Sequence, residues 1–181
     1  MKLSQHQLAP AFHAIDIWGE PFALPNSNGK ATLLMFFRYA ECTLCNFRVA
    51  ELEQAAAQFK SQNLEVIGVF QSPPKSLKEK IENRHSFSFR IIADEERKLY
   101  DLFGVNPSWL RSLSFLGWKS NLQLLRAWKL GFKPGKIEGK FNQIPADFLI
   151  DRENKIQVAH YGKGVTDHLP ISKILAFSES L

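Results

Sequence analysis

The two cysteines of this 181-residue chain lie three positions apart, in the segment Cys42-Thr43-Leu44-Cys45. They follow the apolar run Leu33–Phe37, and a helical pattern begins where they stand. On a helix, residues i and i+3 share one face, so the two sulfurs can bond with little backbone movement. A strand that delivers two cysteines to the start of a helix is typical of dithiol redox chemistry. One thiol would attack a disulfide or a peroxide, and the other would resolve the intermediate.

The attacking species in such chemistry is the thiolate, and a free cysteine has a pKa of about 8.5. The N-terminus of a helix carries a partial positive charge that favours the thiolate. Arg38, ahead of the cysteines, and Arg48, one turn beyond Cys45, are candidate catalytic residues because either side chain could add positive potential. Glu41 opposes ionisation of Cys42. We expect the helix end and the arginines to outweigh this one exposed carboxylate.

A pair of cysteines can also be half of a metal site, or two small buried hydrophobic residues. A metal ion needs about four ligands, so histidines would have to complete the set. The chain offers His6, His13, His85, His160 and His168. None of them forms a ligand-spaced pair with another, so we expect no metal and favour redox chemistry over both alternatives.

Strand-like and helix-like patterns alternate around the cysteines. The apolar run at 31–37 predicts a buried strand, and apolar residues at spacings of three and four predict an amphipathic helix over 43–62. The same order continues with strands at 64–70 and 90–93, a helix opened by a capping box at Ser76–Glu79, and a helix at 95–103. This order predicts a mainly parallel sheet with right-handed crossovers.

Two late apolar runs, 146–150 and 156–161, flank a tight turn and predict an antiparallel hairpin, after which a terminal helix opens near Pro170. Pro145 stands directly before the hairpin. Proline is tolerated at a strand start because no ladder bond is lost there. The other interpretation is a cis Ile144–Pro145 bond that brings backbone against the dithiol as part of a substrate groove. The sequence does not distinguish the two.

Length and composition fit one soluble domain over residues 1–181. The chain is 45% apolar and 23% charged, with a net charge of +5. No run approaches the roughly 18 apolar residues of a membrane-spanning helix, and the N-terminus lacks the apolar core of a secretory signal. We therefore expect a cytoplasmic, reducing setting, in which a structural disulfide is not expected.

Residues 107–140 interrupt the strand–helix rhythm and are expected to be a helical insertion. They hold Trp109, Trp118 and Trp128, with seven basic residues and only Glu138 as an acidic one. The favoured interpretation is a helical cap whose tryptophans pack on the sheet while its lysines face water. The alternative is a surface that binds an anionic membrane or an acidic partner. Nucleic acid is not expected, since no recognised binding module accompanies the charge.

Taken together, these residues resemble the thioredoxin-like superfamily and, within it, the peroxiredoxin-like family (alkyl hydroperoxide reductase / thiol-specific antioxidant, AhpC/TSA), close to its peroxiredoxin-like 2 branch. The resemblance is carried by 36–48, by Asp94-Glu95 with 100–105, and by 145–151. It implies an α/β, thioredoxin-like fold: a central mixed sheet flanked by helices, with a helical insertion before the late hairpin.

The resemblance also implies an antioxidant enzyme that reduces peroxides or disulfides through Cys42 and Cys45, at the expense of thioredoxin or a small thiol. It implies that Pro145 is a cis-proline and that no cofactor is needed. Thr43, Leu44, Ile144 and Pro145 are then expected to line the substrate groove. Membrane contact is not expected, and a homodimer is an open alternative.

The order of attack depends on which relatives guide the comparison. The peroxiredoxin pattern P-x-x-x-T-x-x-C places Cys45 at the attacking position, Cys42 at the threonine and Arg38 at the proline. The thioredoxin pattern makes the more N-terminal Cys42 the nucleophile. We favour Cys42 as nucleophile and Cys45 as resolving thiol. A non-enzymatic alternative is a redox-gated binding protein that uses the basic, tryptophan-rich segment 107–140.

Overall fold

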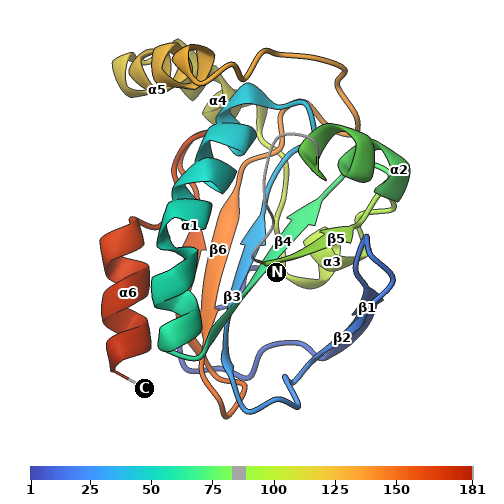
Figure 1. Cartoon of the computed structure of the whole chain (residues 1–181), viewed down its shortest axis with the longest axis vertical. Coiled ribbons are helices and arrows are strands. Elements are labelled where there is room, and N and C mark those ends of the chain that lie inside the picture. The colour runs from blue at the N-terminus through green and yellow to red at the C-terminus, as the bar shows by residue number, and fades with distance from the viewer. Residues whose placement is uncertain (83–88, 181) are drawn as a thin grey trace.

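The computed structural model describes residues 1–82 and 89–180, and its centre is a five-stranded mixed sheet in the order β5-β4-β3-β6-β7 (Figure 1). The strands are β3 (Ala31–Phe36), β4 (Leu64–Phe70), β5 (Arg90–Ala93), β6 (Ala146–Ile150) and β7 (Ile156–Tyr161). β3, β4 and β5 run parallel, whereas β6 pairs antiparallel with both β3 and β7. The mixed sheet implied by the resemblance and the late hairpin are therefore confirmed. The mainly parallel sheet predicted from the order of elements is wrong, because β6 joins the sheet antiparallel to β3 and β7.

The central strand β3 is buried along its whole length, because both faces of the sheet are covered. Side chains alternate along a strand. Leu33 and Met35 belong to the core under α1 (Thr43–Ser61) and α6 (Ile171–Glu179). Leu34 and Phe36 belong to a second core on the other face, which includes Tyr100, Phe103 and Phe148. This burial explains why the strand is apolar without alternation.

The N-terminal residues form a separate two-stranded antiparallel sheet from β1 (Phe12–Ile15) and β2 (Pro21–Leu24). Phe12, Phe22 and Leu24 pack into the second core. The small sheet therefore covers the face of the central sheet opposite α1 (Figure 1).

The second helix begins earlier than predicted. The chain forms α2 (Pro74–Leu77) and continues as a π-helical turn, η1 (Lys78–Glu82). Pro74 occupies the first turn, where its fixed φ suits a helix and its missing N–H costs no bond. Ser76 lies inside the helix and donates from its hydroxyl to Glu138 Oε1 at 2.9 Å. The predicted capping box at Ser76–Glu79 is therefore wrong.

The predicted helix at 95–103 is shorter in the structure, as α3 (Lys98–Leu102). Arg97, directly before it, has a left-handed backbone with φ +63°. The Asp94 carboxylate accepts from the backbone N–H of Leu99 at 2.8 Å and of Tyr100 at 3.1 Å. This side chain supplies the acceptor that the first turn lacks, so the helix starts after Arg97.

The segment 107–140 contains α4 (Trp109–Ser112), the 3-10 turn η2 (Leu113–Leu116) and α5 (Trp118–Lys129), and no other helix is described there. α5 packs on α1. Its buried residues are the small Ser120 and Ala127. The three tryptophans stay exposed, Trp118 to 82%. The prediction that they pack on the sheet is wrong, because α1 and α6 already fill that face. No helix in the described ranges has the length and apolar character needed to span a membrane.

Candidate active site

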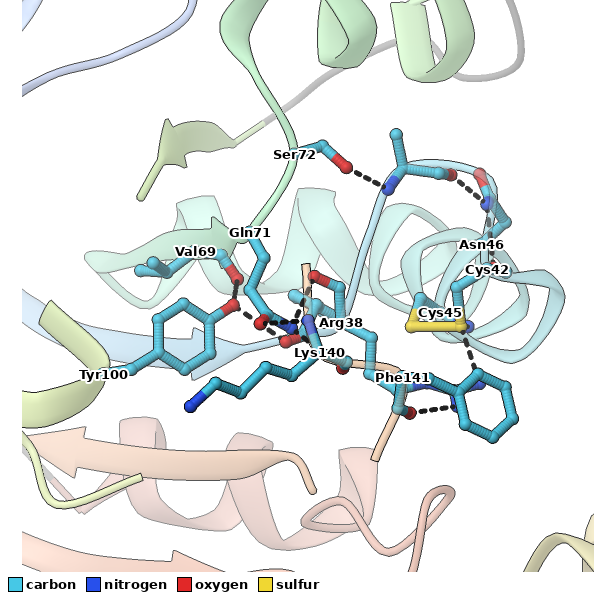
Figure 2. The surroundings of a disulfide bond; sticks show 12 residues. Arg38, Cys42, Cys45, Asn46, Val69, Gln71, Ser72, Tyr100, Lys140 and Phe141 are labelled. Carbon is cyan, nitrogen blue, oxygen red and sulfur yellow. Dashed lines mark hydrogen bonds between the residues drawn. A yellow bond between two sulfur atoms is a disulfide. The ribbon is translucent and has the colours of Figure 1, made fainter. Parts of the chain in front are cut away.

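The two cysteines form a disulfide at the N-terminal end of α1 (Figure 2). Cys42 is the residue that caps the helix, and Cys45 lies in its first turn. Their Cα atoms are 5.2 Å apart, within the usual range for a disulfide. The expectation that both sulfurs share one helix end is confirmed.

The sulfur of Cys42 accepts two hydrogen bonds. One comes from a terminal nitrogen of Arg38 at 3.1 Å, and the other from the backbone N–H of Cys45 at 3.2 Å. Arg38 also donates to the Phe141 carbonyl at 3.3 Å (Figure 2). Its guanidinium lies against the rings of Tyr39 and Phe141. Burial lowers the pKa of Arg38, with Tyr39 opposing the shift, but arginine remains a cation in proteins.

Arg38 is a buried cation without a carboxylate partner. Its exposed fraction is 7%, and within the described residues no Asp or Glu forms an ion pair with it. A buried charge is costly unless it is paired. After reduction, a thiolate on Cys42 would supply the missing counter-ion at hydrogen-bond distance. The structure thus brings the Arg38 guanidinium to the sulfur of Cys42 and not to that of Cys45.

Hydrogen bonds hold the loop that connects β3 to α1. The Ala40 N–H donates to the Ser72 hydroxyl at 2.8 Å. The buried Asn46 amide donates to the carbonyls of Ala40 at 2.7 Å and Cys42 at 2.9 Å (Figure 2). These bonds hold the backbone that carries Arg38 and Cys42, and the Phe141 carbonyl holds the guanidinium itself.

Glu41 does not act as the exposed carboxylate beside Cys42 that the sequence suggested. Its side chain is 13% exposed and pairs with Lys80 Nζ at 3.2 Å, so the prediction of an exposed carboxylate is wrong. The carboxylate also accepts from the backbone N–H of Lys136. Gly135 lies so close that a Cβ atom there would collide with the Glu41 carboxylate. A Glu41 carboxylate whose charge is balanced by Lys80 opposes ionisation of Cys42 less than an unpaired carboxylate would.

Residues 132–141, here called the covering segment, cross the dithiol end of the molecule. They contact Glu41 through Gly135 and Arg38 through Phe141. Both sulfur-bearing residues are buried, Cys42 being 1% and Cys45 4% exposed. A substrate that reaches sulfur therefore needs local movement here.

Arg48, predicted as a second cation of the dithiol, makes its hydrogen bonds elsewhere. Its guanidinium donates to Glu51 at 3.0 Å and to the Leu169 carbonyl at 2.5 Å. It also lies close enough to lower the pKa of the Asp147 carboxylate. The structure places Arg48 in an ion network on the sheet side of α1, and none of its hydrogen bonds reaches a sulfur.

That network centres on Asp147, which is fully buried in β6. His168 Nδ1 lies 2.8 Å from one carboxylate oxygen, and the Leu169 N–H donates to the other at 2.6 Å. Burial by itself raises the pKa of Asp147. The charge and hydrogen bond of His168, the charge of Arg48 and the Leu169 N–H outweigh it and lower the pKa below its usual value.

Replacing Asp147 by Asn should destabilise the protein at neutral pH and have a smaller effect in acid. Removing one member of a buried ion pair costs about 3 kcal/mol at around pH 7. The folded pKa lies below the unfolded value of about 3.9, so the wild type itself loses this contribution as the pH falls below about 4. Urea unfolding at about pH 7 and pH 3 measures both effects. Asp101→Asn, at an exposed carboxylate, is the control. An equal loss from Asp147→Asn at both pH values would contradict the assignment.

The predicted groove residues do not gather around the dithiol. Ile144 and Pro145 line a pocket of about 390 Å³ with Arg111 and Tyr161, and neither cysteine lines it. Ile144–Pro145 is trans, since the cis bond of the described chain is Leu24–Pro25. The predicted cis-proline is therefore wrong. The trans form of an X–Pro bond is intrinsically favoured by about 0.5–1 kcal/mol. A trans proline also fits directly before β6, because proline is tolerated at a strand start.

Thr43 and Leu44, between the cysteines, face other surroundings. The Thr43 hydroxyl is buried and has no hydrogen-bond partner among the described residues. Leu44 lines a second pocket, of about 310 Å³, together with Phe47, Arg48 and His168. The four residues predicted to form one groove are thus divided between the helix start and two separate pockets.

Gln71 is a site residue that sequence reasoning missed. Its amide donates to the Arg38 carbonyl at 3.3 Å, and its oxygen accepts from the Lys140 N–H at 2.9 Å (Figure 2). The Arg97 guanidinium donates a hydrogen bond to the same oxygen at 3.0 Å. Gln71 thereby connects the Arg38 backbone to the covering segment. A signal existed: parallel β3 and β4 end at the same edge of the sheet, so a polar residue just after β4 must lie near Arg38.

The histidines considered as metal ligands lie in separate places. His85 is outside the described residues. His160 Nε2 is 3.3 Å from Asp167, whereas His168 pairs with Asp147. In residues 1–82 and 89–180, no three side chains of His, Cys, Asp and Glu converge as a metal site.

A disulfide at the start of a helix, on a mixed sheet with this strand order, defines a thiol oxidoreductase of the thioredoxin-like class. The AhpC/TSA family matches residues 6–159 of the chain. The chain belongs to the AhpC/TSA family, as the resemblance predicted.

Two curated relatives illustrate the range of this similarity. Thiol-disulfide oxidoreductase ResA of Halalkalibacterium halodurans is 27% identical over 92 residues, which are 51% of this chain and 52% of that protein. This match therefore spans about half of the length of ResA. Rv2521 of Mycobacterium tuberculosis, provisionally named a peroxiredoxin, is 22% identical over 170 residues, 93% of this chain and 91% of that protein.

Solved structures agree on the fold. Peroxidoxin BcpB from Mycobacterium tuberculosis superposes with a TM-score of 0.69 at 17% identity, covering 99% of this chain and 98% of that one. A peroxiredoxin-like protein from Aquifex aeolicus gives a TM-score of 0.71 at 12% identity, covering 99% and 88%. The predicted thioredoxin-like, peroxiredoxin-type fold is confirmed.

Proposed function

We propose that the chain reduces small hydroperoxides with Cys42 as the attacking thiolate and Cys45 as the resolving thiol. One observation carries this assignment. Within the described residues, both hydrogen bonds that reach a sulfur end on Cys42, from Arg38 and from the Cys45 N–H. Donors directed at a sulfur stabilise its thiolate, and the thiolate is the reactive form.

Reduction of the peroxide would proceed in two steps, attack on the peroxide and formation of the disulfide. The Cys42 thiolate attacks one peroxide oxygen, the O–O bond breaks, and the leaving oxygen takes a proton and departs as water or an alcohol. Cys42 is thereby oxidised to a sulfenic acid. The Cys45 thiol then attacks that sulfur, water leaves, and the Cys42–Cys45 disulfide forms. Two electrons and two protons from an external dithiol such as thioredoxin, or from two small thiols, restore the pair.

Burial of the sulfurs favours a small oxidant. With Cys42 1% exposed, a hydroperoxide needs less displacement of the covering segment than a folded protein disulfide would. Arg38 is also placed to stabilise the negative charge that develops on the leaving oxygen, because its guanidinium already contacts the sulfur.

Thiol–disulfide exchange is a second candidate function, supported by the C-x-x-C spacing and by the similarity to ResA. The same Cys42 thiolate would attack a substrate sulfur, and Cys45 would displace the product thiol from the mixed disulfide. The two functions share both cysteines and Arg38 and differ in the atom attacked.

Rapid mixing of the reduced protein with hydrogen peroxide, and separately with insulin under an added thiol reductant, tests both functions. We expect one peroxide molecule to consume two thiols and to form the intramolecular disulfide. Mass spectrometry of the protein measures this disulfide. We expect a rate well above that of free cysteine at the same pH. Insulin reduction without peroxide consumption would replace the first function by the second. Failure of both reactions would remove the proposed enzyme activity.

A further inference from the structure

Exposed apolar side chains are concentrated in one part of the molecule. Fifteen large hydrophobic residues are exposed among those described, and ten of them lie between Trp109 and Phe141. They include Leu110 at 82%, Trp118 at 82% and Trp109 at 71%. A cluster of this kind on a water-facing surface indicates an interaction site more often than scattered apolar residues do.

Helix α5 presents its apolar face to solvent. Ser120 and Ala127 face inward and are buried, being 4% and 0% exposed. On the outward face Trp118, Leu122 and Leu125 are 82%, 40% and 54% exposed, and their spacing of four and three residues aligns them along one stripe. This orientation is the reverse of that expected for an amphipathic helix on a soluble protein.

The same segment carries exposed basic side chains. Those that the structure shows as exposed in this segment are Arg111, Arg126, Lys129, Lys133, Lys136 and Lys140. The segment 107–140 has only one acidic residue, Glu138, which accepts from Ser76 and lies 3.7 Å from Lys136. We call the exposed apolar residues of 109–141, together with these basic residues, the basic aromatic surface.

We infer that the basic aromatic surface docks on an anionic lipid bilayer, a role beyond the proposed peroxidase activity and opposite to the expectation, drawn from the sequence, of no membrane contact. Tryptophan prefers the interface between headgroups and acyl chains, and clustered Lys and Arg are attracted to anionic lipids. The stripe of Trp118, Leu122 and Leu125 lines neither of the two pockets described above. An exposed stripe of this kind matches a fluid surface, which needs no complementary shape.

Charge complementarity separates this occupant from a second copy of the chain. Two copies meeting through this surface would bring like charges together, and like charges opposite one another oppose association. A bilayer rich in anionic headgroups offers the opposite charge over the whole surface at once. An acidic protein shares that charge, so the test below includes it as an outcome.

Docking through this surface would orient the dithiol. Figure 1 shows α5 beside the N-terminal end of α1, and the two helices are in contact. The covering segment follows α5 and reaches Arg38 through Phe141. Lys133, Lys136 and Lys140 belong both to this segment and to the basic aromatic surface. The end of α1 that carries Cys42 and Cys45 would therefore face the bilayer.

Flotation with extruded vesicles tests the inference on the full-length protein. Vesicles of phosphatidylcholine alone are compared with vesicles that hold about one third phosphatidylglycerol. We expect at least about tenfold stronger binding to the anionic vesicles, a blue shift of tryptophan fluorescence on binding, and loss of most binding at about 0.5 M salt, where charge attraction is screened. Equal binding to both vesicles, or none to either, would overturn the inference.

Paired variants separate this surface from general effects. Leu122→Gln/Leu125→Gln and Lys129→Gln/Lys133→Gln should each weaken binding to anionic vesicles by about fivefold or more. Leu8→Gln/Ile15→Gln and Lys30→Gln/Lys60→Gln change the same residue types at exposed positions outside the surface and should leave binding unchanged. Circular dichroism checks that every variant is folded.

Two further outcomes would assign the surface to another occupant and reject the bilayer. In one, sedimentation velocity shows a dimer that Leu122→Gln/Leu125→Gln dissociates, while vesicles stay unbound. In the other, the protein binds polyglutamate and does not bind anionic vesicles. That result would point to an acidic protein held by charge alone.

Discussion

Cys42→Ser should reduce peroxide consumption to the background rate, whereas Cys45→Ser should keep the first attack and stop at the sulfenic acid. The reason lies in the hydrogen bonds to sulfur. Cys42 Sγ receives the Arg38 guanidinium at 3.1 Å and the Cys45 N–H at 3.2 Å, so its thiolate is the stabilised one. A serine hydroxyl at position 42 does not ionise near neutral pH and cannot replace the thiolate.

Mass spectrometry after one equivalent of peroxide distinguishes the two variants. With dimedone present, Cys45→Ser should gain one adduct at Cys42, and Cys42→Ser should gain none. The wild type should form the internal disulfide instead and remain unlabelled. The reverse pattern, an adduct on Cys45 alone, would mean that the peroxiredoxin alignment gives the order of attack and that Cys42 resolves.

The parts of the fold that follow local rules could be predicted from the sequence. The apolar run at 31–37 became the buried β3 (Ala31–Phe36), and the three-residue spacing placed Cys42 and Cys45 at one helix end. These features depend on periodicity, helix termini and burial, which neighbouring residues determine. Pro145 marked the start of β6 correctly, but its isomer depends on surroundings that its neighbours do not reveal.

The contacts that complete the site join distant positions, and no local pattern specifies them. Arg38 meets the Phe141 carbonyl across 103 positions of the chain. Arg48 resembles Arg38 in type and in distance from a cysteine, yet its guanidinium turns to Leu169, 121 positions away. Charge and spacing identified both arginines as candidates, but only the tertiary packing decides which of them contacts sulfur.

The outward face of α5 shows a different limit of sequence reasoning. The pattern of apolar residues gave the helix, but not the side on which it packs. A helix normally buries its apolar stripe, which is why Trp118 and Trp128 were expected on the sheet. The core face under α1 and α6 was already filled, so α5 docked through Ser120 and Ala127 instead. Burial thus depends on how much of the sheet remains uncovered as well as on periodicity.

Arg38→Met should slow the reaction of reduced Cys42 with peroxide by about tenfold to a hundredfold near neutral pH. A hydrogen bond to a charged group contributes about 1.5–3 kcal/mol, and each 1.4 kcal/mol corresponds to a factor of ten. Methionine fills similar space without the charge, so the thiolate loses its counter-ion while packing against Tyr39 and Phe141 is largely kept.

Alkylation of the reduced protein by iodoacetamide across a range of pH measures this effect directly. Arg38→Met should move the midpoint for Cys42 to higher pH, and Arg38→Lys should restore part of the shift. Arg48→Met is the matched control, because Arg48 is equally buried at 7% but bonds to Glu51 and Leu169. Arg48→Met should lower the stability of the protein but leave the alkylation midpoint of Cys42 nearly unchanged. The same midpoint in wild type and Arg38→Met, or an equal shift in Arg48→Met, would remove Arg38 from the site.

The same variant should make the disulfide harder to reduce. In the oxidised protein Arg38 is a buried cation without a carboxylate, whereas in the reduced protein the Cys42 thiolate balances its charge. Arg38 therefore stabilises the reduced state relative to the oxidised one, and removing it should lower the reduction potential. Each tenfold loss in the equilibrium constant corresponds to about 30 mV for this two-electron couple. Equilibration with a glutathione buffer should show a more negative potential for Arg38→Met, and a more positive one would mean that the guanidinium favours the disulfide.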